Sequence, residues 1–307
     1  MKSESFSLSE QVEFIKIIAH NDFYWATSLS HPIFKSCRVL ATVHDVAQLD
    51  LPTSSYNGLL HKLIFWFYFK SLHSKSKGLA FNSKFTRDRF KHHFPNNDIP
   101  EAITHLGSNK TRESVEEFNE IGKERYFVTI GNNRPHKNLP FMISSFLSNE
   151  KLNEYRLKVI GSNADLSPPP GVCKTNWSRI EFLGYIPDCE LENQITHAQA
   201  LFFPSLYEGF GLPAIEALSL GCPVIASNNA ALPEICGDVA IYFDPRDRKS
   251  FESAIDTFFL AIQGNNLNNL SSRCRMQASK FSWNRCIEET SNLFVRILNC
   301  PKSLLSG

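Results

Sequence analysis

Residues 204–216 combine a glycine-containing loop, a proline and two carboxylates in a pattern that suits a phosphate-bearing ligand. Pro213 fits the first turn of a helix, where the N–H that proline lacks has no intrahelical acceptor. A helix that begins here, next to the flexible Gly209 and Gly211, offers unpaired N–H donors to an anion such as phosphate. We expect these donors to be the backbone amides of Gly211, Leu212, Ala214 and Ile215.

Two carboxylates flank this phosphate site. Glu216 lies about one turn into the predicted helix, where its carboxylate can accept hydrogen bonds from a vicinal diol such as ribose. Glu208 precedes the glycines on the loop and can accept hydrogen bonds from a sugar in the same way. A phosphate site between two diol-binding carboxylates describes a nucleotide-sugar.

Two other interpretations apply to the same residues. The glycines could simply form a strand–helix turn, or Gly209-x-Gly211-x-x-Ala214 could be a loose dinucleotide-binding pattern. That pattern has its first glycine directly after the strand and an acidic residue about 20 positions later. Here a loop separates Phe203 from Gly209, and the next strand ends at 227–229 without an acid. The sequence therefore disfavours a nicotinamide enzyme.

A second segment, residues 128–139, again predicts a strand followed by a loop that enters a helix. Arg134 and Lys137 would project from the carboxyl end of this strand, where they could neutralise a diphosphate. In isolation a solvated basic turn explains these residues better. This basic segment and the glycine-containing segment belong to one predicted sheet, and their presence together favours the interpretation that both bind a ligand.

Strands and helices alternate through the second half of the chain. Strands are expected at 126–130, 156–160, 180–183, 200–203, 223–226 and 240–243, and helices near 139–147, 189–198, 213–220, 231–236, 248–263 and 284–298. This alternation predicts an α/β fold with a parallel sheet that is covered on both faces and binds ligands at the carboxyl ends of its strands.

The first half is less regular. A helix is expected near 8–19, where Ser7 and Glu10 form a capping-box pattern, and the first convincing strand is Val39–Val43, ending at His44. Further elements are expected at 59–73 (helix), 79–82 (strand) and 84–94 (helix), and the polar stretch 105–124 marks a domain boundary.

Length, charge and cysteine content exclude several kinds of protein. The 307 residues predict two domains, and a formal charge of +1 disfavours a dedicated nucleic-acid binder. The eight cysteines include no CxxC pair, which indicates free thiols in a reducing compartment rather than zinc or disulfides. The polar N-terminus lacks a signal-peptide core, so we expect a cytoplasmic location.

One helix has an unusual surface. Residues 56–77 combine a strongly apolar, aromatic run with Lys62, Lys70, Lys75 and Lys77 and contain no acid. Core packing with solvated lysines is the favoured interpretation, and peripheral contact with an anionic membrane at the inner face is the alternative.

Several motifs together resemble the retaining glycosyltransferases of family four, the "group 1" transferases. They are Gly131-x-x-x-Pro135-His136-Lys137-Asn138, the segment from Pro204 to Glu216 with its Glu-Gly-Phe-Gly-Leu-Pro core, Gly221–Ser227, and Leu232-Pro233-Glu234. The resemblance covers roughly residues 30–298 and implies a glycosyltransferase-B fold, with two Rossmann-like domains and the donor bound in the second.

The resemblance also implies site roles. Lys137 would hold the donor diphosphate, Glu216 the ribose and Glu208 the sugar hydroxyls, while the amides from Gly209 through Phe210 and Gly211 to Leu212 contact the donor. Asn132 stands where many relatives have an arginine, and Arg134 is the substitute. His44 resembles the family's strand-end histidine that faces the transferred sugar, with a structural histidine as the alternative. The segment Phe81–Thr86 resembles the family's serine turn, and an N-cap explains Ser83 equally well.

We expect residues 1–110 to form the N-terminal, acceptor-side domain, 111–283 the nucleotide-sugar domain, and 284–307 a helix that packs back on the first domain. Relatives begin with a strand, a glycine-containing loop and a helix, so this first domain is expected to be truncated. Three explanations fit such a truncation: the chain is a fragment of a longer gene product, a partner supplies the missing part, or the site is compromised.

The resulting prediction is transfer of a hexose from a nucleotide-diphosphate sugar to a saccharide or lipid-linked acceptor, with retained configuration, in surface polysaccharide synthesis. The Pro-His-Lys-Asn loop mildly favours mannose, and the lack of an Asp-x-Asp pair points to metal-independent transfer without a cofactor. The alternatives are a non-catalytic nucleotide-sugar-binding subunit, or an epimerase or phosphorylase on the same fold.

Overall fold

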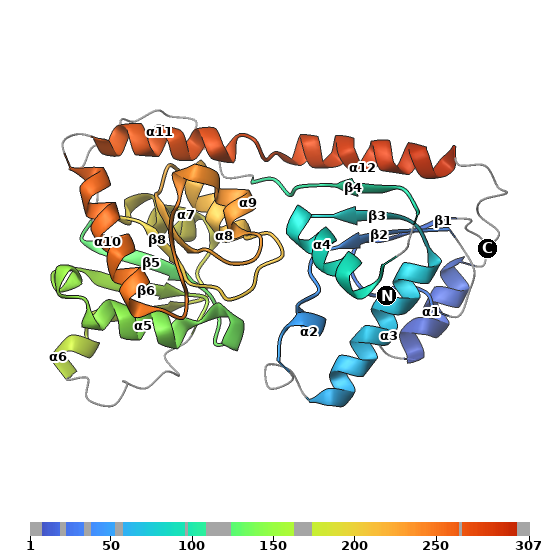
Figure 1. Cartoon of the computed structure of the whole chain (residues 1–307), viewed down its shortest axis with the longest axis horizontal. Helices are drawn as coiled ribbons and strands as arrows, with labels where there is room; N and C mark the ends of the chain where they lie inside the picture. The colour runs from blue at the N-terminus through green and yellow to red at the C-terminus, as the bar shows by residue number, and fades with distance from the viewer. Residues whose placement is uncertain are drawn as a thin grey trace. The chain divides into compact units, whose positions relative to one another are not determined.

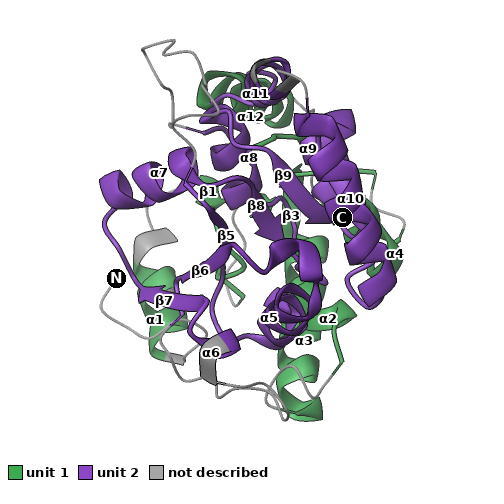
Figure 2. Cartoon of the chain, turned by 90° about the vertical axis from the view of Figure 1, so that its left-hand side faces the viewer, with its two compact units in different colours: residues 1–106, 283–307 green, residues 107–282 purple. Residues whose placement is uncertain are grey.

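The computed structural model describes residues 8–18, 23–33, 38–52, 58–95, 98–108, 124–162, 174–263 and 266–299. The chain divides into two compact units (Figure 2). Unit 1 is made of residues 1–106 together with 283–307, and unit 2 is made of residues 107–282. Each unit has its own parallel sheet and its own hydrophobic core.

Unit 1 contains a four-stranded parallel sheet in the order β1-β2-β3-β4 (Figure 1). Its strands are β1 (Phe23–Ala26), β2 (Arg38–Val43), β3 (Ser76–Phe81) and β4 (Glu101–Ile103). Its helices are α1 (Leu8–Ile18), α2 (Ala47–Asp50), α3 (Leu59–Lys75), α4 (Lys84–His93) and α12 (Trp283–Leu298).

Alternation along the strands gives this sheet two buried faces. On one face, Val39, Ala41 and Val43 of β2 join a cluster with residues of α3 and α4, among them Phe69, Leu72 and Phe90. On the other face, Leu40 and Ala80 pack with Leu293 and Ile297 of α12. Gly78 of β3 lets α12 approach closely, because a side chain at that position would collide with Ile297. Helix α12, at the far end of the sequence, therefore completes the core of unit 1.

Most expected elements of unit 1 are confirmed, but the expectation that the strand ending at His44 comes first is wrong. Strand β1 precedes it and pairs with β2. Strand β1 has four residues, of which Phe23 and Tyr24 are half-buried and Trp25 is exposed, so it shows no clear alternation. Strand β4 is shorter still. The expected cap Ser7 lies outside the described residues, whereas Ser83 does cap α4 by accepting a hydrogen bond from the Thr86 amide.

The surface of α3 changes along its length. Its C-terminal half is buried through Tyr68, Phe69, Ser71 and Leu72. Its N-terminal half exposes large apolar side chains, namely Leu59, Leu60, Leu63, Ile64, Trp66 and Phe67. Core packing thus explains only half of this helix; residues 56 and 57 lie outside the described part. Among the described helices, none is both long and apolar enough to cross a membrane.

Unit 2 contains a six-stranded parallel sheet. Its strands are β5 (Tyr126–Ile130), β6 (Arg156–Ile160), β7 (Ile180–Gly184), β8 (Leu201–Phe203), β9 (Val224–Ser227) and β10 (Ile241–Phe243). Its helices are α5 (Leu139–Ser148), α6 (Lys174–Trp177), α7 (Asp188–His197), α8 (Leu212–Ser219), α9 (Leu232–Cys236), α10 (Arg248–Ile262) and α11 (Asn266–Ala278), with short 3₁₀ turns η3 (Pro135–Lys137), η4 (Glu150–Leu152) and η5 (Gly237–Val239).

In the strand order β10-β9-β8-β5-β6-β7, the side of the sheet to which successive strands are added reverses once, although all strands remain parallel. The chain starts at β5, moves outward to β6 and β7, and then returns to β8 on the opposite side of β5. Parallel sheets of this type bind ligands at the carboxyl ends of the two strands that flank such a reversal. Strands β5 and β8 are these two strands, and both motif-bearing loops follow them directly.

All six strands expected in unit 2 are confirmed, but α11 was not expected. Its sequence is rich in asparagine and serine, which have low helix propensity. A signal was nevertheless present, because the buried Leu267, Leu270, Cys274 and Ala278 recur on one helical face.

Candidate functional site

The loops after β5 and β8 are joined at the carboxyl edge of the unit 2 sheet. The Leu206 amide donates a hydrogen bond to the His136 carbonyl oxygen over 2.7 Å. The Asn138 side-chain amide donates to the Pro204 carbonyl over 3.2 Å and to the Pro245 carbonyl over 2.8 Å. These bonds hold the basic segment against the glycine-containing segment.

Lys137 and Glu208 form an ion pair across these two loops. The Lys137 Nζ lies 2.7 Å from Glu208 Oε1, and the two side chains are only 20% and 13% exposed. The same Nζ lies 5.8 Å from the centre of the Phe203 ring, at the end of β8. The structure therefore brings together two of the predicted site residues, a cation and an anion, at the reversal point of the sheet.

Gly131 shapes the position of Lys137. A Cβ at residue 131 would lie 3.3 Å from the Lys137 Cβ, which is tighter than ordinary contact. The missing side chain lets the lysine stem lie directly against the end of β5. Because long side chains lose rotamer freedom when they are held in this way, the lysine charge is positioned before any ligand arrives.

Helix α8 begins at the same edge of the sheet. Gly211 caps it with φ 101°, a left-handed conformation, and a Cβ there would lie 2.8 Å from the Leu232 Cδ2. The expectation of four unpaired amides is partly wrong, because the amides of Ala214 and Ile215 both donate to the Gly211 carbonyl, over 3.0 and 3.3 Å. The Gly211 and Leu212 amides remain as first-turn donors that lack an intrahelical acceptor by geometry.

The other predicted donor-binding residues lie around this helix start. Glu216 is half-buried on α8, one turn beyond the cap, and Gly209 is buried in the loop. The Phe210 ring packs against Phe281 at 5.9 Å, so its side chain belongs to the core and does not reach a ligand. Arg134 is exposed, and its backbone amide donates to Asn132 Oδ1. Arg134 therefore does not join the Lys137–Glu208 pair.

Two residues of this edge lie in the predicted motifs but were given no role from the sequence. Asn138 adopts a left-handed backbone with φ 58° and ties three loops together through its amide. Ser205 has a buried Oγ with no hydrogen-bond partner among the described residues, directly after β8. Pro204 marks the end of the strand in the sequence. A serine directly after it, at the carboxyl end of a strand, was the signal that could have indicated a site residue.

His44 belongs to unit 1, at the carboxyl end of β2. Its backbone carbonyl accepts hydrogen bonds from Asn82 Nδ2 over 2.7 Å and from Thr86 Oγ1 over 3.3 Å. Its exposed imidazole lies with Nε2 3.0 Å from the Thr27 carbonyl. The segment that resembles a serine turn thus fixes the backbone of His44, and the imidazole is oriented from β1.

Relatives of this chain include enzymes named as mannosyltransferases. The chain is 32% identical over 181 residues to the O-antigen chain mannosyltransferase B of Escherichia coli, covering 57% of this chain and 47% of that protein. It is 30% identical over 219 residues to the O-antigen chain mannosyltransferase RfbU of Salmonella typhimurium, covering 70% and 59%. The chain thus spans roughly half the length of these curated relatives.

A solved structure shows the fold. Sucrose-phosphate synthase from Thermosynechococcus elongatus superposes with a TM-score of 0.74 at 16% identity, covering 95% of this chain and 78% of that one. The two parallel α/β sheets therefore form a glycosyltransferase-B fold.

The family model described as "Glycosyl transferases group 1" matches residues 110–277. The match includes the Lys137–Glu208 pair, Gly211 and Glu216, and it spans more than half of the 307 residues. This chain belongs to the group 1 glycosyl transferases.

Proposed function

We propose that this protein transfers a hexose, with mannose preferred, from a nucleotide-diphosphate sugar to a saccharide or lipid-linked acceptor during surface polysaccharide synthesis. Configuration is retained by attack on the same face from which the diphosphate departs. The observation that carries the proposal is the Lys137–Glu208 pair, which joins the loops after β5 and β8 at the reversal point of the unit 2 sheet. The names of the mannosyltransferase relatives support the choice of sugar.

Each site residue has a role in this proposal. Lys137 and the first-turn amides of α8 offset the negative charge that builds on the departing diphosphate. Glu216 accepts hydrogen bonds from the ribose hydroxyls, and Glu208 accepts them from the sugar while keeping Lys137 in place. His44, from unit 1, contacts the transferred sugar. The amides and Lys137 supply the positive charge, so the proposed transfer is independent of metal.

Lys137→Ala tests this assignment. We expect the donor affinity or the turnover to fall about 10- to 150-fold, because a hydrogen bond to a charged group contributes about 1.5–3 kcal/mol. Glu216→Ala should lower them by a similar factor. Donor binding is measured by thermal shift with GDP-mannose, UDP-glucose and UDP-N-acetylglucosamine, and transfer is measured by release of the nucleoside diphosphate.

The matched control is Lys151→Ala. Lys151 also forms an ion pair, with Asp256, but both side chains are more than half exposed and neither belongs to a motif loop. This variant should keep full donor binding. Unchanged activity in both Lys137→Ala and Glu216→Ala would remove the site assignment. Donor binding without transfer or donor hydrolysis would select a non-catalytic binding subunit instead.

We also propose that the protein works in the cytoplasm and contacts the inner membrane face through the exposed part of α3. Leu63 and Phe67 are each 55% exposed there, and Lys62 and Lys70 lie beside them without a neighbouring acid in the helix. An apolar surface with flanking lysines is attracted to anionic lipid headgroups. A lipid-linked acceptor would be reached at such a surface.

A further inference from the structure

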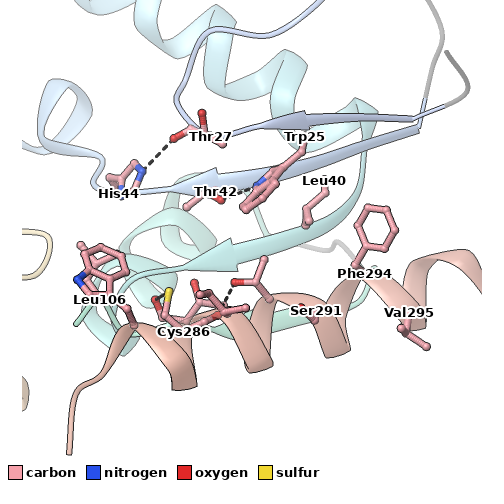
Figure 3. A pocket seen from close by; sticks show the side chains of 14 residues that line it. Trp25, Thr27, Leu40, Thr42, His44, Leu106, Cys286, Ser291, Phe294 and Val295 are labelled. Atoms are coloured by element: carbon pink, nitrogen blue, oxygen red, sulfur yellow. Dashed lines mark hydrogen bonds between the residues drawn. The ribbon is translucent and has the colours of Figure 1, made fainter. Parts of the chain in front are cut away.

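Unit 1 contains a pocket of about 540 Å³ between one face of its sheet and helix α12 (Figure 3). Leu40 and Thr42 of β2 and Trp25 of β1 line the sheet side. The α12 side is formed by residues that recur along the helix, namely Trp283, Cys286, Ile287, Thr290, Ser291, Phe294 and Val295. A volume of this size is typical of a small-molecule site.

One end of the pocket is polar. Thr27, His44 and Thr104 line it, and they directly follow β1, β2 and β4. These are the carboxyl ends of parallel strands, where α/β sheets bind their ligands. The His44 imidazole lies at this end, beside the Thr27 carbonyl. A ligand group that carries hydroxyls would find donors and acceptors here.

The body of the pocket is apolar. The Trp25 indole N–H donates to Thr42 Oγ1 over 3.0 Å, so the only polar atom of the indole is satisfied within the sheet. The Phe294 ring contacts Phe23 at 4.5 Å and closes the far end. Trp25, Ile287 and Val295 remain 48%, 62% and 53% exposed, which leaves apolar surface in contact with water. A hydrocarbon that covers this surface would be stabilised by its burial.

The pocket is also long. Its α12 lining runs from Trp283 to Val295, which corresponds to about 18 Å along a helix axis. A compact sugar would fill the polar end and leave most of this length empty. A chain-like apolar group joined to a hydroxyl-bearing head matches both the length and the change in polarity.

We propose that this pocket binds the hydrocarbon chain of an amphipathic acceptor and that the acceptor's hydroxyl-bearing head lies at the His44 end. The inference rests on the proposed function, because it names the class of acceptor that the transferase uses. It assigns acceptor selection to residues of β1, β2 and α12, none of which belongs to the donor site of unit 2.

The test compares two ligands that share a head and differ only in the chain. Titration calorimetry on the full chain measures the affinity for n-octyl α-mannoside, kept below its micelle concentration, and for methyl α-mannoside. Each buried methylene should raise the affinity roughly fourfold. We therefore expect the octyl compound to bind at least about tenfold more tightly.

A pair of neighbouring variants locates the binding site. Ser291 lines the pocket from α12, and Asn292 is the next residue, exposed and outside the lining. Ser291→Trp should fill the pocket and abolish the preference for the octyl chain, whereas Asn292→Trp should keep it. Both substitutions place the same side chain at an exposed position of α12, so their effects on folding should match, as circular dichroism and thermal melting would show.

Three results would overturn the inference. They are equal affinity for the two mannosides, an octyl preference that survives Ser291→Trp, and a dimer in solution that Ser291→Trp dissociates, which would assign the pocket to a second copy of the chain. The donor assays on Lys137→Ala are independent of these measurements. If the protein bound the octyl compound but no nucleotide-sugar, the pocket would still be a hydrocarbon-binding site, and the proposed function would be contradicted instead.

Discussion

Single residues set the geometry of the donor site, and Gly211 shows this most directly. Its φ of 101° is a conformation that other L-residues rarely adopt, and a Cβ would meet the buried Leu232 at 2.8 Å. We expect Gly211→Ala to lower the free energy of unfolding by about 2 kcal/mol or more, since backbone strain and a steric clash add together. Urea denaturation measures this change.

Gly161→Ala separates the two contributions. Gly161 also has positive φ, at 84°, but a Cβ there would lie 3.6 Å from its nearest neighbour, an ordinary contact. This variant should lose only about 1 kcal/mol, which is the cost of the backbone conformation alone. If both variants lost the same free energy of unfolding, the Leu232 side chain would be moving aside to accommodate the Cβ, and glycine would be needed at 211 only for its positive φ.

For single residues, the sequence predicts which ones belong to the site better than it predicts which residues they contact. Lys137 and Glu208 were each predicted as ligand-binding residues, but nothing in the sequence indicated that they would pair with each other across 71 positions. Their contact depends on which strands become neighbours in the sheet. The amides of Ala214 and Ile215 were predicted to be free, and the tight turn at Gly211 uses both of them.

At the scale of elements, α3 gives the clearest expectation. Leu63→Asp combined with Phe67→Asp places two carboxylates on the exposed face of the helix, where they would repel anionic lipid and remove apolar contact. We expect binding to phosphatidylglycerol vesicles, measured by flotation, to fall severalfold. Binding of the unaltered protein should weaken as salt is raised, because salt screens the attraction of the lysines.

The control for this experiment is Leu260→Asp. Leu260 is 67% exposed on α10 in unit 2, so its substitution replaces one exposed apolar side chain with a carboxylate at a different element, and it is compared with each single substitution on α3. It should leave vesicle binding unchanged. Equal binding of the unaltered protein to phosphatidylcholine and phosphatidylglycerol would contradict a role for the lysines.

Elements with a clear apolar run or a clear apolar period were predictable, and elements without one, or with a polar sequence around it, were not. Strands β5, β8 and β9 of unit 2 are almost fully buried and mostly apolar, which explains why their positions were evident. Strand β1 is half-buried at two positions and exposed at a third, so it is neither a buried run nor an alternating one, and α11 has a buried stripe inside a polar, asparagine-rich sequence. Tertiary packing, rather than local preference, decides such segments.

For the whole molecule, two separate cores predict two unfolding steps. The core of unit 2 lies around Phe127, Phe202 and Phe258, while that of unit 1 lies around Phe69 and Phe81. A ligand stabilises only the structure that binds it. A nucleoside diphosphate lacks the sugar that His44 would contact, so we expect it to raise the melting temperature of one step by several degrees in calorimetry and to leave the other nearly unchanged. Lys137→Ala should remove the shift. A single transition that moves as a whole would show that the two units unfold together.

Helix α12 has a consequence for the way the chain is made. Unit 1 is discontinuous in sequence, because strands β1 to β4 come before unit 2 and helix α12, with Leu293 and Ile297, comes after it. Unit 2 is contiguous and can fold while the ribosome is still adding residues. Leu40 and Ala80 must wait, with one sheet face uncovered, until α12 leaves the exit tunnel. The interval between these two events is when the nascent chain most needs a chaperone, because the sheet of unit 1 reaches its folded state only after a helix that is made later than the whole of unit 2.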